Sequence, residues 1–317
     1  MAGIRNQNIA ADAAIDISKL AWRELLAPKH TDGTLPRYWY VSKGGHDGNP
    51  GTREQPLLTV GMGVSKARSG RGDVILVGPG EYAETVDVNK SDLSIIGCGN
   101  HDRGLVQIIG DGSTAQATIQ VLDGFTRGFR LANLEVDTNG VSQPAIHIQT
   151  NNVDSGGYAN TGMRWYVEHV QVNSSAPTIG LLLDGASMGV VKDCYFGQVT
   201  IGIGLKGSAN NFPDNILFKD VEFTNNVTAD VATVTDVAGT IGSVDLQDVR
   251  FVRPRFNDRG GTPVTNYINL STGTMVNVNF VDARFARDVA DGTLMVLPAD
   301  VIVLGHSAAG VESIIGA

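Results

Sequence analysis

The sequence predicts an all-β chain wound into a parallel β-helix, and two observations carry that prediction. First, an eight-residue pattern of apolar, any, apolar, any, Asp, apolar, any, apolar returns along the chain, most clearly as Ile216–Phe223. Second, the apolar residues of each copy alternate with a period of two, which is the spacing of a β-strand. Short strands that recur along one chain indicate a solenoid of stacked coils.

The spacing between the copies also favours strands over helices. The other copies are Val244–Phe251, Val278–Phe285, Phe129–Val136, Trp165–Val172, Gly189–Phe196 and, faintest, Leu93–Asn100. Their Asp slots lie 36, 36, 24, 27, 28 and 34 residues apart. A helical repeat keeps its length because two helices pack in each unit, whereas coils of strands tolerate insertions in their turns.

The Asp slot predicts a corner between two strands. Apolar residues lie at even offsets before the slot and at odd offsets after it, so one residue is used to turn the chain. Asp and Asn adopt the left-handed conformation of such a corner more readily than other non-glycine residues. A column of corner carboxylates is therefore expected on neighbouring coils, formed by Asp193, Asp220, Asp248 and Asp282.

Stacked carboxylates repel one another, so the corner column needs compensation. Hydrogen bonds from the amides of each bend are one source of it. A bound calcium ion is the functional alternative, which makes these four aspartates candidate metal ligands. The sequence otherwise gives no pattern for a cofactor, and the scattered histidines lack partners at metal-ligand spacing.

A third strand completes each coil. It is an apolar run that ends near Gly, Asn or Asp, found at Ile119–Val121, Ile146–Ile148, Ile179–Leu183, Ile201–Leu205 and Ile268–Leu270. With coils stacked at ~4.8 Å, about seven or eight of them would form a rod ~35 Å long.

Whole-chain properties limit the function classes. The 317 residues suit one solenoid domain, and the 39 glycines and 18% charged residues suit a turn-rich folded chain. A formal net charge of −9 argues against a nucleic-acid partner. No segment has the length and apolarity of a membrane span or the order of a signal peptide, so no membrane partner is expected.

The two cysteines, Cys98 and Cys194, each follow a corner slot directly. They are three coils apart, or roughly 14 Å along the axis, which is too far for a disulfide. Both are expected to be small buried residues of the core.

Residues 1–36 lack the repeat and end at prolines, which indicates an N-terminal arm. The segment Asn8–Leu20 resembles a short stretch found near the N-termini of tailed-bacteriophage virion proteins, including tail fibres. That resemblance implies an attachment arm that contacts another virion subunit through apolar residues, for which the candidates are Ile9, Ile15, Ile17, Leu20 and Trp22. An alanine-rich helix start of no particular meaning is the alternative.

Residues 40–82 resemble the start of the pectate-lyase-like right-handed parallel β-helix superfamily. A Gly/Asn/Pro-rich loop at Gly44–Pro56 precedes a short helix expected over 59–67 and then a first coil at Val74–Val77. The first coil of a solenoid exposes apolar side chains and strand edges, so the helix is expected to cap it. Residues 37–317 would then form a single right-handed β-helix.

The catalytic motifs of this superfamily are missing from the sequence. Neither the polygalacturonase-type motifs nor the calcium-binding aspartates and Arg base of pectate lyases have a counterpart. Glu135 and Asp137 alternate on one strand face, and two carboxylates at that spacing could serve glycoside hydrolysis. The alternative is a solvated outer face, because the same slot after the corner holds Gln171, Tyr195, Glu222, Arg250 and Arg284 in other copies.

Two function classes remain. The first is a non-enzymatic structural protein at the virion surface, most directly a capsid decoration protein that contacts capsid or tail subunits through its arm. The second is a tailspike or tail-fibre protein that binds or depolymerises host surface polysaccharide, as a polysaccharide lyase or glycoside hydrolase. The apolar C-terminal runs Leu294–Leu297 and Val301–Leu304 lack an evident cap, so a second subunit is expected to cover them, as in a homotrimer.

Overall fold

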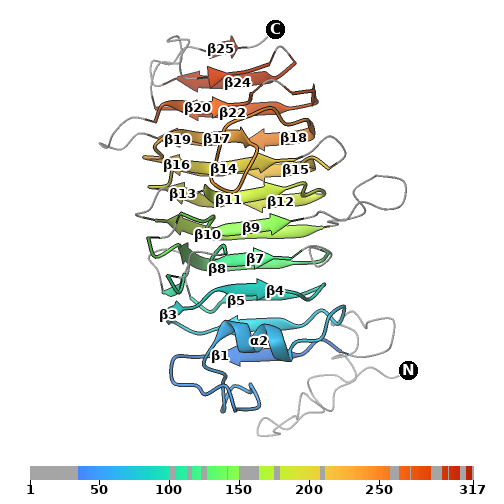
Figure 1. Cartoon of the computed structure of the whole chain (residues 1–317), viewed down its shortest axis with the longest axis vertical. Coiled ribbons are helices and arrows are strands. Elements are labelled where there is room, and N and C mark those ends of the chain that lie inside the picture. The colour runs from blue at the N-terminus through green and yellow to red at the C-terminus, as the bar shows by residue number, and fades with distance from the viewer. Residues whose placement is uncertain are drawn as a thin grey trace, which may run out of the picture.

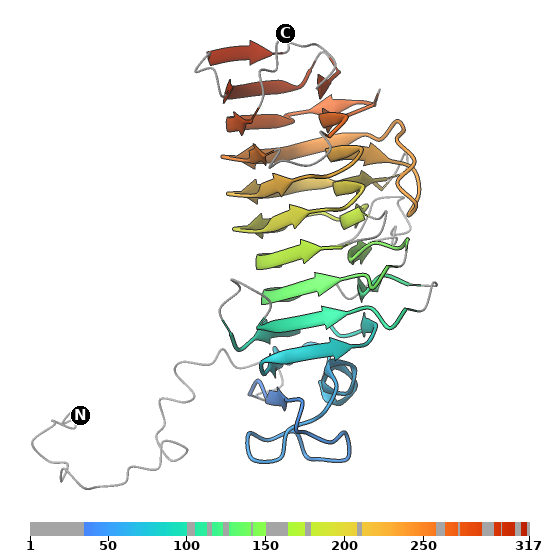
Figure 2. The ribbon, with the colours of Figure 1, turned by 90° about the vertical axis from the view of Figure 1, so that its left-hand side faces the viewer.

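In the computed structural model the chain forms an elongated stack of strand coils, from β1 beside helix α2 at one end to β24 and β25 at the other (Figures 1 and 2). The structure describes residues 35–99, 105–112, 116–122, 127–140, 142–149, 164–174, 179–207, 211–257, 264–271, 273–286, 295–298, 300–307 and 312–315. Across these ranges, no helix has the length and apolarity needed to cross a membrane.

The strands of the coils form three rows. The first row contains β1 (Tyr38–Val41), β2 (Val74–Val77), β5 (Ser94–Gly97), β12 (Gly189–Lys192), β15 (Asp214–Lys219), β18 (Leu246–Val252), β21 (Met275–Val276) and β24 (Ile302–Ser307). The second row contains β3 (Gly80–Ala83), β6 (Val106–Ile109), β13 (Tyr195–Gly197), β16 (Glu222–Thr224) and β19 (Arg255–Asn257). Three long strands run through both rows: β8 (Arg130–Asp137), β10 (Trp165–Asn173) and β22 (Asn279–Phe285). β24 likewise continues from the first row into the second, where it pairs with the end of β22.

The third row is a separate 8-stranded sheet. Its strands are β4 (Val86–Val88), β7 (Ile119–Val121), β9 (Ile146–Gln149), β11 (Ile179–Asp184), β14 (Ile201–Lys206), β17 (Ala229–Val234), β20 (Asn266–Asn269) and β23 (Met295–Val296). Each strand pairs in parallel with its equivalent in the next coil, for example β11 with β14. The predicted all-β parallel β-helix is confirmed.

Two columns of left-handed residues turn the chain at either side of the first row. The first corner column has positive φ throughout and consists of Gly72, Asp92, Gly128, Arg164, Met188, Asn215, Asp248 and Asn277. The second corner column lies five residues later in each coil and consists of Asn133, His169, Asp193, Asp220, Arg253 and Asp282, with φ between 51° and 58°. The predicted corner conformation is therefore confirmed for the Asp slot.

The register of one repeat differs from the prediction. Ile216 pairs with Val249 and Phe218 pairs with Phe251, so the copy equivalent to Ile216–Phe223 is 249–256, not Val244–Phe251. Asp248 therefore belongs to the first corner column, and Arg253 takes the place next to Asp220. The physical reason is that both columns require the same left-handed backbone, which Asp tolerates in either place.

Inward-facing aromatic rings form two stacks along the axis of the rod. Phe218, Phe251 and Phe280 stack with ring centroids 4.2 and 4.4 Å apart. A parallel stack joins Phe223, Phe256 and Phe285 at 5.2 and 4.9 Å. Because like positions lie directly above one another in a parallel solenoid, one aromatic slot in the repeat produces a continuous stack in the core.

The cap helix forms where the sequence predicts it, as α2 (Val60–Lys66). The Thr59 side chain accepts a hydrogen bond from a first-turn amide and so acts as the N-cap. Glu84 adds a second cap, since its two carboxylate oxygens accept hydrogen bonds from the backbone amides of Val60 and Gly61 at 2.8 Å each. Val60 and Val64 are buried against the first coil.

Asp73 ties the chain before β1 to the first coil. Its buried carboxylate accepts hydrogen bonds from the backbone amides of Arg37 at 3.0 Å and Arg68 at 2.9 Å. It also accepts the indole Nε1 of Trp39 at 3.1 Å and forms an ion pair with Arg71. Burial by itself would raise the pKa of Asp73, but these donors together hold that pKa below its ordinary value.

The C-terminal end of the first row is covered by a strand of the same chain. β25 (Glu312–Ile315) runs antiparallel to β24, with Val303 opposite Ile315 and His306 opposite Glu312. The backbone edge of β24 is therefore paired within the chain, which the sequence did not predict.

The two cysteines have different environments. Both are free thiols, Cys194 buried and Cys98 exposed. The expectation of a buried residue is thus correct for Cys194 and wrong for Cys98. The difference arises because Gly97 is not a left-handed corner, and the second-row strand of that coil begins only at Val106.

Candidate functional site

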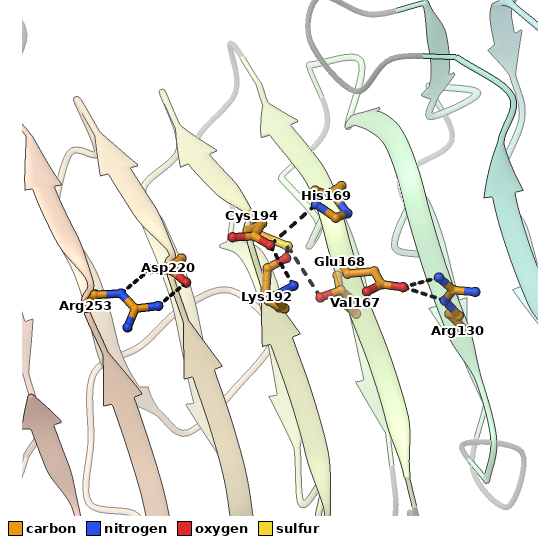
Figure 3. A network of polar contacts seen from close by, with 9 residues as sticks. Arg130, Val167, Glu168, His169, Lys192, Cys194, Asp220 and Arg253 are labelled. Atoms are coloured by element: carbon orange, nitrogen blue, oxygen red, sulfur yellow. Dashed lines mark hydrogen bonds and ion pairs between the residues drawn. The ribbon is translucent and has the colours of Figure 1, made fainter.

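The second corner column brings charged side chains of successive coils into contact (Figure 3). The carboxylate of Asp193 lies 3.1 Å from Lys192 Nζ and 3.4 Å from His169 Nε2. Asp220 accepts two hydrogen bonds at 2.7 Å each from the guanidinium of Arg253. The hydrogen bond from Arg253 holds the pKa of Asp220 below its usual range.

Three of the four predicted aspartates have side-chain partners, which neither bend amides nor a calcium ion would supply. Asp193 and Asp220 are compensated by cationic side chains of their own or adjacent coils, and Asp248 sits in the other column, where it accepts a hydrogen bond from Asn277 Nδ2 at 2.8 Å. Within the described ranges, no group of three or more His, Cys, Asp or Glu side chains is arranged to hold a metal ion. Asp193, Asp220 and Asp248 thus each contact a side chain of a neighbouring coil.

Another ion pair lies on the outer side of the first row, beside this column. Arg130 Nε donates to Glu168 Oε1 at 2.6 Å, which joins β8 to β10 (Figure 3). The thiol of Cys194 contacts the backbone oxygens of Val167 at 3.5 Å and Lys192 at 3.2 Å beneath these charges. Burial raises the pKa of Cys194 to about 12, so its thiol stays protonated near neutral pH.

Glu135 and Asp137 lie on the outer face of the second row, at the end of β8. Their positions two residues apart on one strand place their Cα atoms about 7 Å apart. Burial, followed by the charge of Asp137, raises the pKa of Glu135. Glu135 accepts a hydrogen bond from Gln107 Nε2 at 3.3 Å, and Asp137 accepts the amide of Asn139 at 2.9 Å.

The column that contains Glu135 continues along the second row. Strand register places Gln107, Glu135, Gln171, Tyr195, Glu222, Arg255 and Arg284 in successive coils. Arg255 therefore replaces the expected Arg250, which lies on the first row. Glu222 meets Arg255 at 3.9 Å and accepts a hydrogen bond from Asn257 Nδ2 at 2.8 Å.

Sequence reasoning missed one charged cluster, on the outer side of the third row. Asp184 Oδ2 lies 2.7 Å from Lys206 Nζ and 3.5 Å from His147 Nε2, and both His147 and Asp184 are buried. Burial would raise the pKa of Asp184, but the contacts with His147 and Lys206 together lower it. These residues lie at outward positions of β9, β11 and β14, a signal that only the correct strand register reveals.

The candidate partner residues of the arm, Ile9, Ile15, Ile17, Leu20 and Trp22, lie outside the described residues. Their role stays a prediction from the sequence.

Comparison with known proteins shows likeness at the level of structure. No protein-family model and no curated protein matches the sequence. A rhamnogalacturonan lyase matches with a TM-score of 0.50 and 15% identity, over 86% of this chain and 67% of that one. The Escherichia coli protein ybhc matches with a TM-score of 0.51 and 12% identity, over 88% of this chain and 77% of that one. These likenesses agree with the parallel β-helix fold that the strand pairing shows.

A weaker likeness is that to pectate lyase Pel9A, with a TM-score of 0.47 and 14% identity over 81% of this chain. The chain spans 65% of the length of that lyase, which is less than two thirds. At these identities the comparisons establish the fold, and the function has to be argued from this chain's own residues.

Proposed function

We propose that this chain is a non-enzymatic structural protein of a bacteriophage virion, a capsid decoration protein held to the particle by residues 1–36. The observation that carries the structural role is the second corner column. Its side chains make contacts between coils, as in the contacts of Asp193 with His169 and of Asp220 with Arg253. The virion context is supported by the likeness of residues 8–20 to segments of phage virion proteins.

A passive structural role fits the way this rod is held together. Polar contacts along its surface, such as Arg130 with Glu168 and Glu222 with Asn257, join one coil to the next. Inside, an aromatic stack joins the later coils, from Phe218 through Phe251 to Phe280. A body of this kind suits a subunit that projects from a particle as a homotrimer, with residues 1–36 bound to a capsid or tail subunit.

The direct test is binding to particles that lack the protein. The full chain should co-sediment with such particles, and a variant without residues 1–36 should stay in the supernatant while keeping its β-sheet circular dichroism. A narrower variant replaces Ile9, Ile15, Ile17 and Leu20 by Asp, matched by Val227→Asp at a side chain that is 57% exposed on the rod. Undiminished binding of the truncated chain would contradict the proposal.

A second candidate is a tailspike or tail-fibre protein that binds or depolymerises host surface polysaccharide. One observation favours it: Glu135, with its raised pKa, lies on one strand face with Asp137, and glycosidases use a pair of neighbouring carboxyl groups of which one has a raised pKa. Incubation with host capsular or lipopolysaccharide glycan tests it. New reducing ends or unsaturated products that vanish in Glu135→Gln would favour the tailspike, and unchanged glycan would favour the decoration protein.

A further inference from the structure

The outer face of the first row is unusually apolar for a surface. Strand register assigns it two outward residues from each of ten strands: Tyr38, Tyr40, Val74, Leu76, Ser94, Ile96, Arg130, Ala132, Tyr166, Glu168, Val190, Lys192, Leu217, Lys219, Arg250, Val252, Asn279, Val281, Ile302 and Leu304. Thirteen of these twenty are aliphatic or aromatic. Several are well exposed, including Tyr38 at 52%, Tyr166 at 41% and Ile302 at 46%. We name this surface the first-row face.

The second-row face of the same coils has a different composition. Its outward residues are mainly charged or amide side chains: Glu81, Gln107, Glu135, Asp137, Gln171, Asn173, Glu222, Arg255, Asn257 and Arg284, together with Ala83, Ile109, Tyr195, Gly197 and Thr224. Two faces with the same strand geometry thus differ in side-chain chemistry. The difference indicates that the first-row face meets something other than water.

The third row also has an apolar outer patch, but the chain covers that patch itself. Ile179, Leu182, Ile201 and Ala232 form a buried cluster on the outer side of β11, β14 and β17, against which Ile241 packs. Ile241 belongs to the segment that follows β17 and returns across these strands (Figure 1). Gly239 of this segment lies so close that a Cβ there would be 3.1 Å from Ile201 Cδ1. The first-row face has no such cover in the described part of the chain, as the exposure of Tyr38, Tyr166 and Ile302 shows.

Charge indicates what covers the first-row face. It carries Arg130, Lys192, Lys219 and Arg250 against Glu168, a formal sum of +3 within a chain of net charge −9. The second-row face carries Glu81, Glu135, Asp137 and Glu222 against Arg255 and Arg284, a formal sum of −2. Opposite charges on two faces of one chain suit a contact between copies of that chain.

The heights of these charges along the rod match when two copies lie side by side with parallel axes. Arg130 and Glu135 both belong to β8, and Lys219 and Glu222 end and begin the neighbouring strands β15 and β16 of a later coil. A first-row face placed against a second-row face at equal height therefore brings Arg130 opposite Glu135, and Lys219 opposite Glu222. Because the two faces differ, the contact is heterologous, and such a contact forms a ring when the rotation between neighbouring copies closes.

The available area is sufficient for such a contact. Ten strands at a spacing of about 4.8 Å and a width of about four residues at 3.3 Å give a face of about 600 Å². Both partners together would bury about 1,200 Å², which is the lower end of stable specific interfaces. In a closed ring each copy uses both faces and so buries this area twice.

We propose that the first-row face binds the second-row face of a second copy of this chain, with parallel axes, in a closed ring of side-by-side β-helices. This proposal specifies the surface of the homotrimer named under the proposed function, and it does not depend on the virion location. If the chain formed the ring but did not bind particles, the proposed virion location would be wrong and the proposed contact between copies would still hold.

The first test is the mass of the full chain in solution. Light scattering at micromolar concentration should give a multiple of the monomer mass, and Tyr166→Glu should reduce it to one monomer because a charge is placed in the apolar contact. The matched control is Gln120→Glu on the third row, which should leave the oligomer mass unchanged. A monomeric wild-type chain, or a Tyr166→Glu chain that is folded and keeps the oligomer mass, would overturn the proposal.

A second test does not depend on how Tyr166→Glu folds. In a Cys98→Ser background, Lys219→Cys combined with Glu222→Cys should form disulfides between copies under mild oxidation, giving dimers and larger species on a non-reducing gel. The control pair Lys219→Cys with Gln120→Cys should remain monomeric on the same gel. Equal cross-linking of both pairs, or of neither in an oligomeric sample, would show that these faces do not meet.

Discussion

Replacing Phe251 by Ala should be among the most destabilising single changes in this chain. Phe251 is fully buried and stacks between Phe218 at 4.2 Å and Phe280 at 4.4 Å, with interplanar angles of 5° and 6°. A buried Phe→Ala change costs about 3–5 kcal/mol through lost burial and the cavity that remains. Each lost stacking contact contributes about 0.5–1.5 kcal/mol, which places this variant at the upper end of that range.

Urea unfolding followed by far-UV circular dichroism measures this loss. Leu105→Ala is the control, because Leu105 is a large apolar side chain that is 47% exposed and should change stability by no more than about 0.5 kcal/mol. Phe251→Leu should lie between the two, since it keeps most of the apolar volume. If Phe251→Ala lost no more stability than Leu105→Ala, the assignment of an inward stack would be wrong.

Three further predictions concern local features. Asp73→Asn should lower the free energy of unfolding by about 1–3 kcal/mol at neutral pH. Because folding lowers the pKa of Asp73, its carboxylate contributes fully above the pKa of the unfolded chain. In urea titrations the difference between variant and wild type should therefore shrink as the pH falls below about 4. Met188→Gly should raise the unfolding free energy by about 0.5–1 kcal/mol, because Met188 is held at φ 54° and is 42% exposed, so a left-handed penalty is removed with little loss of burial. Iodoacetamide should modify the native chain at Cys98 and leave the buried Cys194 unmodified by mass spectrometry until urea is added.

The sequence predicted the coils well because the repeat has a period of two and a corner residue that tolerates positive φ. It predicted one register wrongly because the first corner column, five residues before the second, also accepts Asp. Asp248 fills the earlier corner of its coil, and Arg253 fills the later one, so a search for Asp at the corner aligned the wrong residues. The missed signal is the Asp, Asn or Gly that often precedes each repeat, as at Asp92 and Asn215.

The candidate site was less predictable than the fold. The sequence identified Asp220 as a corner residue, but its ion pair with Arg253 depends on the corrected register. The cluster of His147, Asp184 and Lys206 joins three coils whose relative alignment no local pattern reveals. Contacts between coils depend on insertions in the turns, and these vary from coil to coil.

Averaged electron cryo-microscopy density of intact particles tests the central claim most directly. We expect density for groups of three β-helices on the outer shell, with residues 1–36 in contact with shell subunits. The number of these groups should be in a fixed ratio to the number of shell subunits. Density for the chain at the tail alone, with the shell bare, would contradict the decoration role and favour the tailspike.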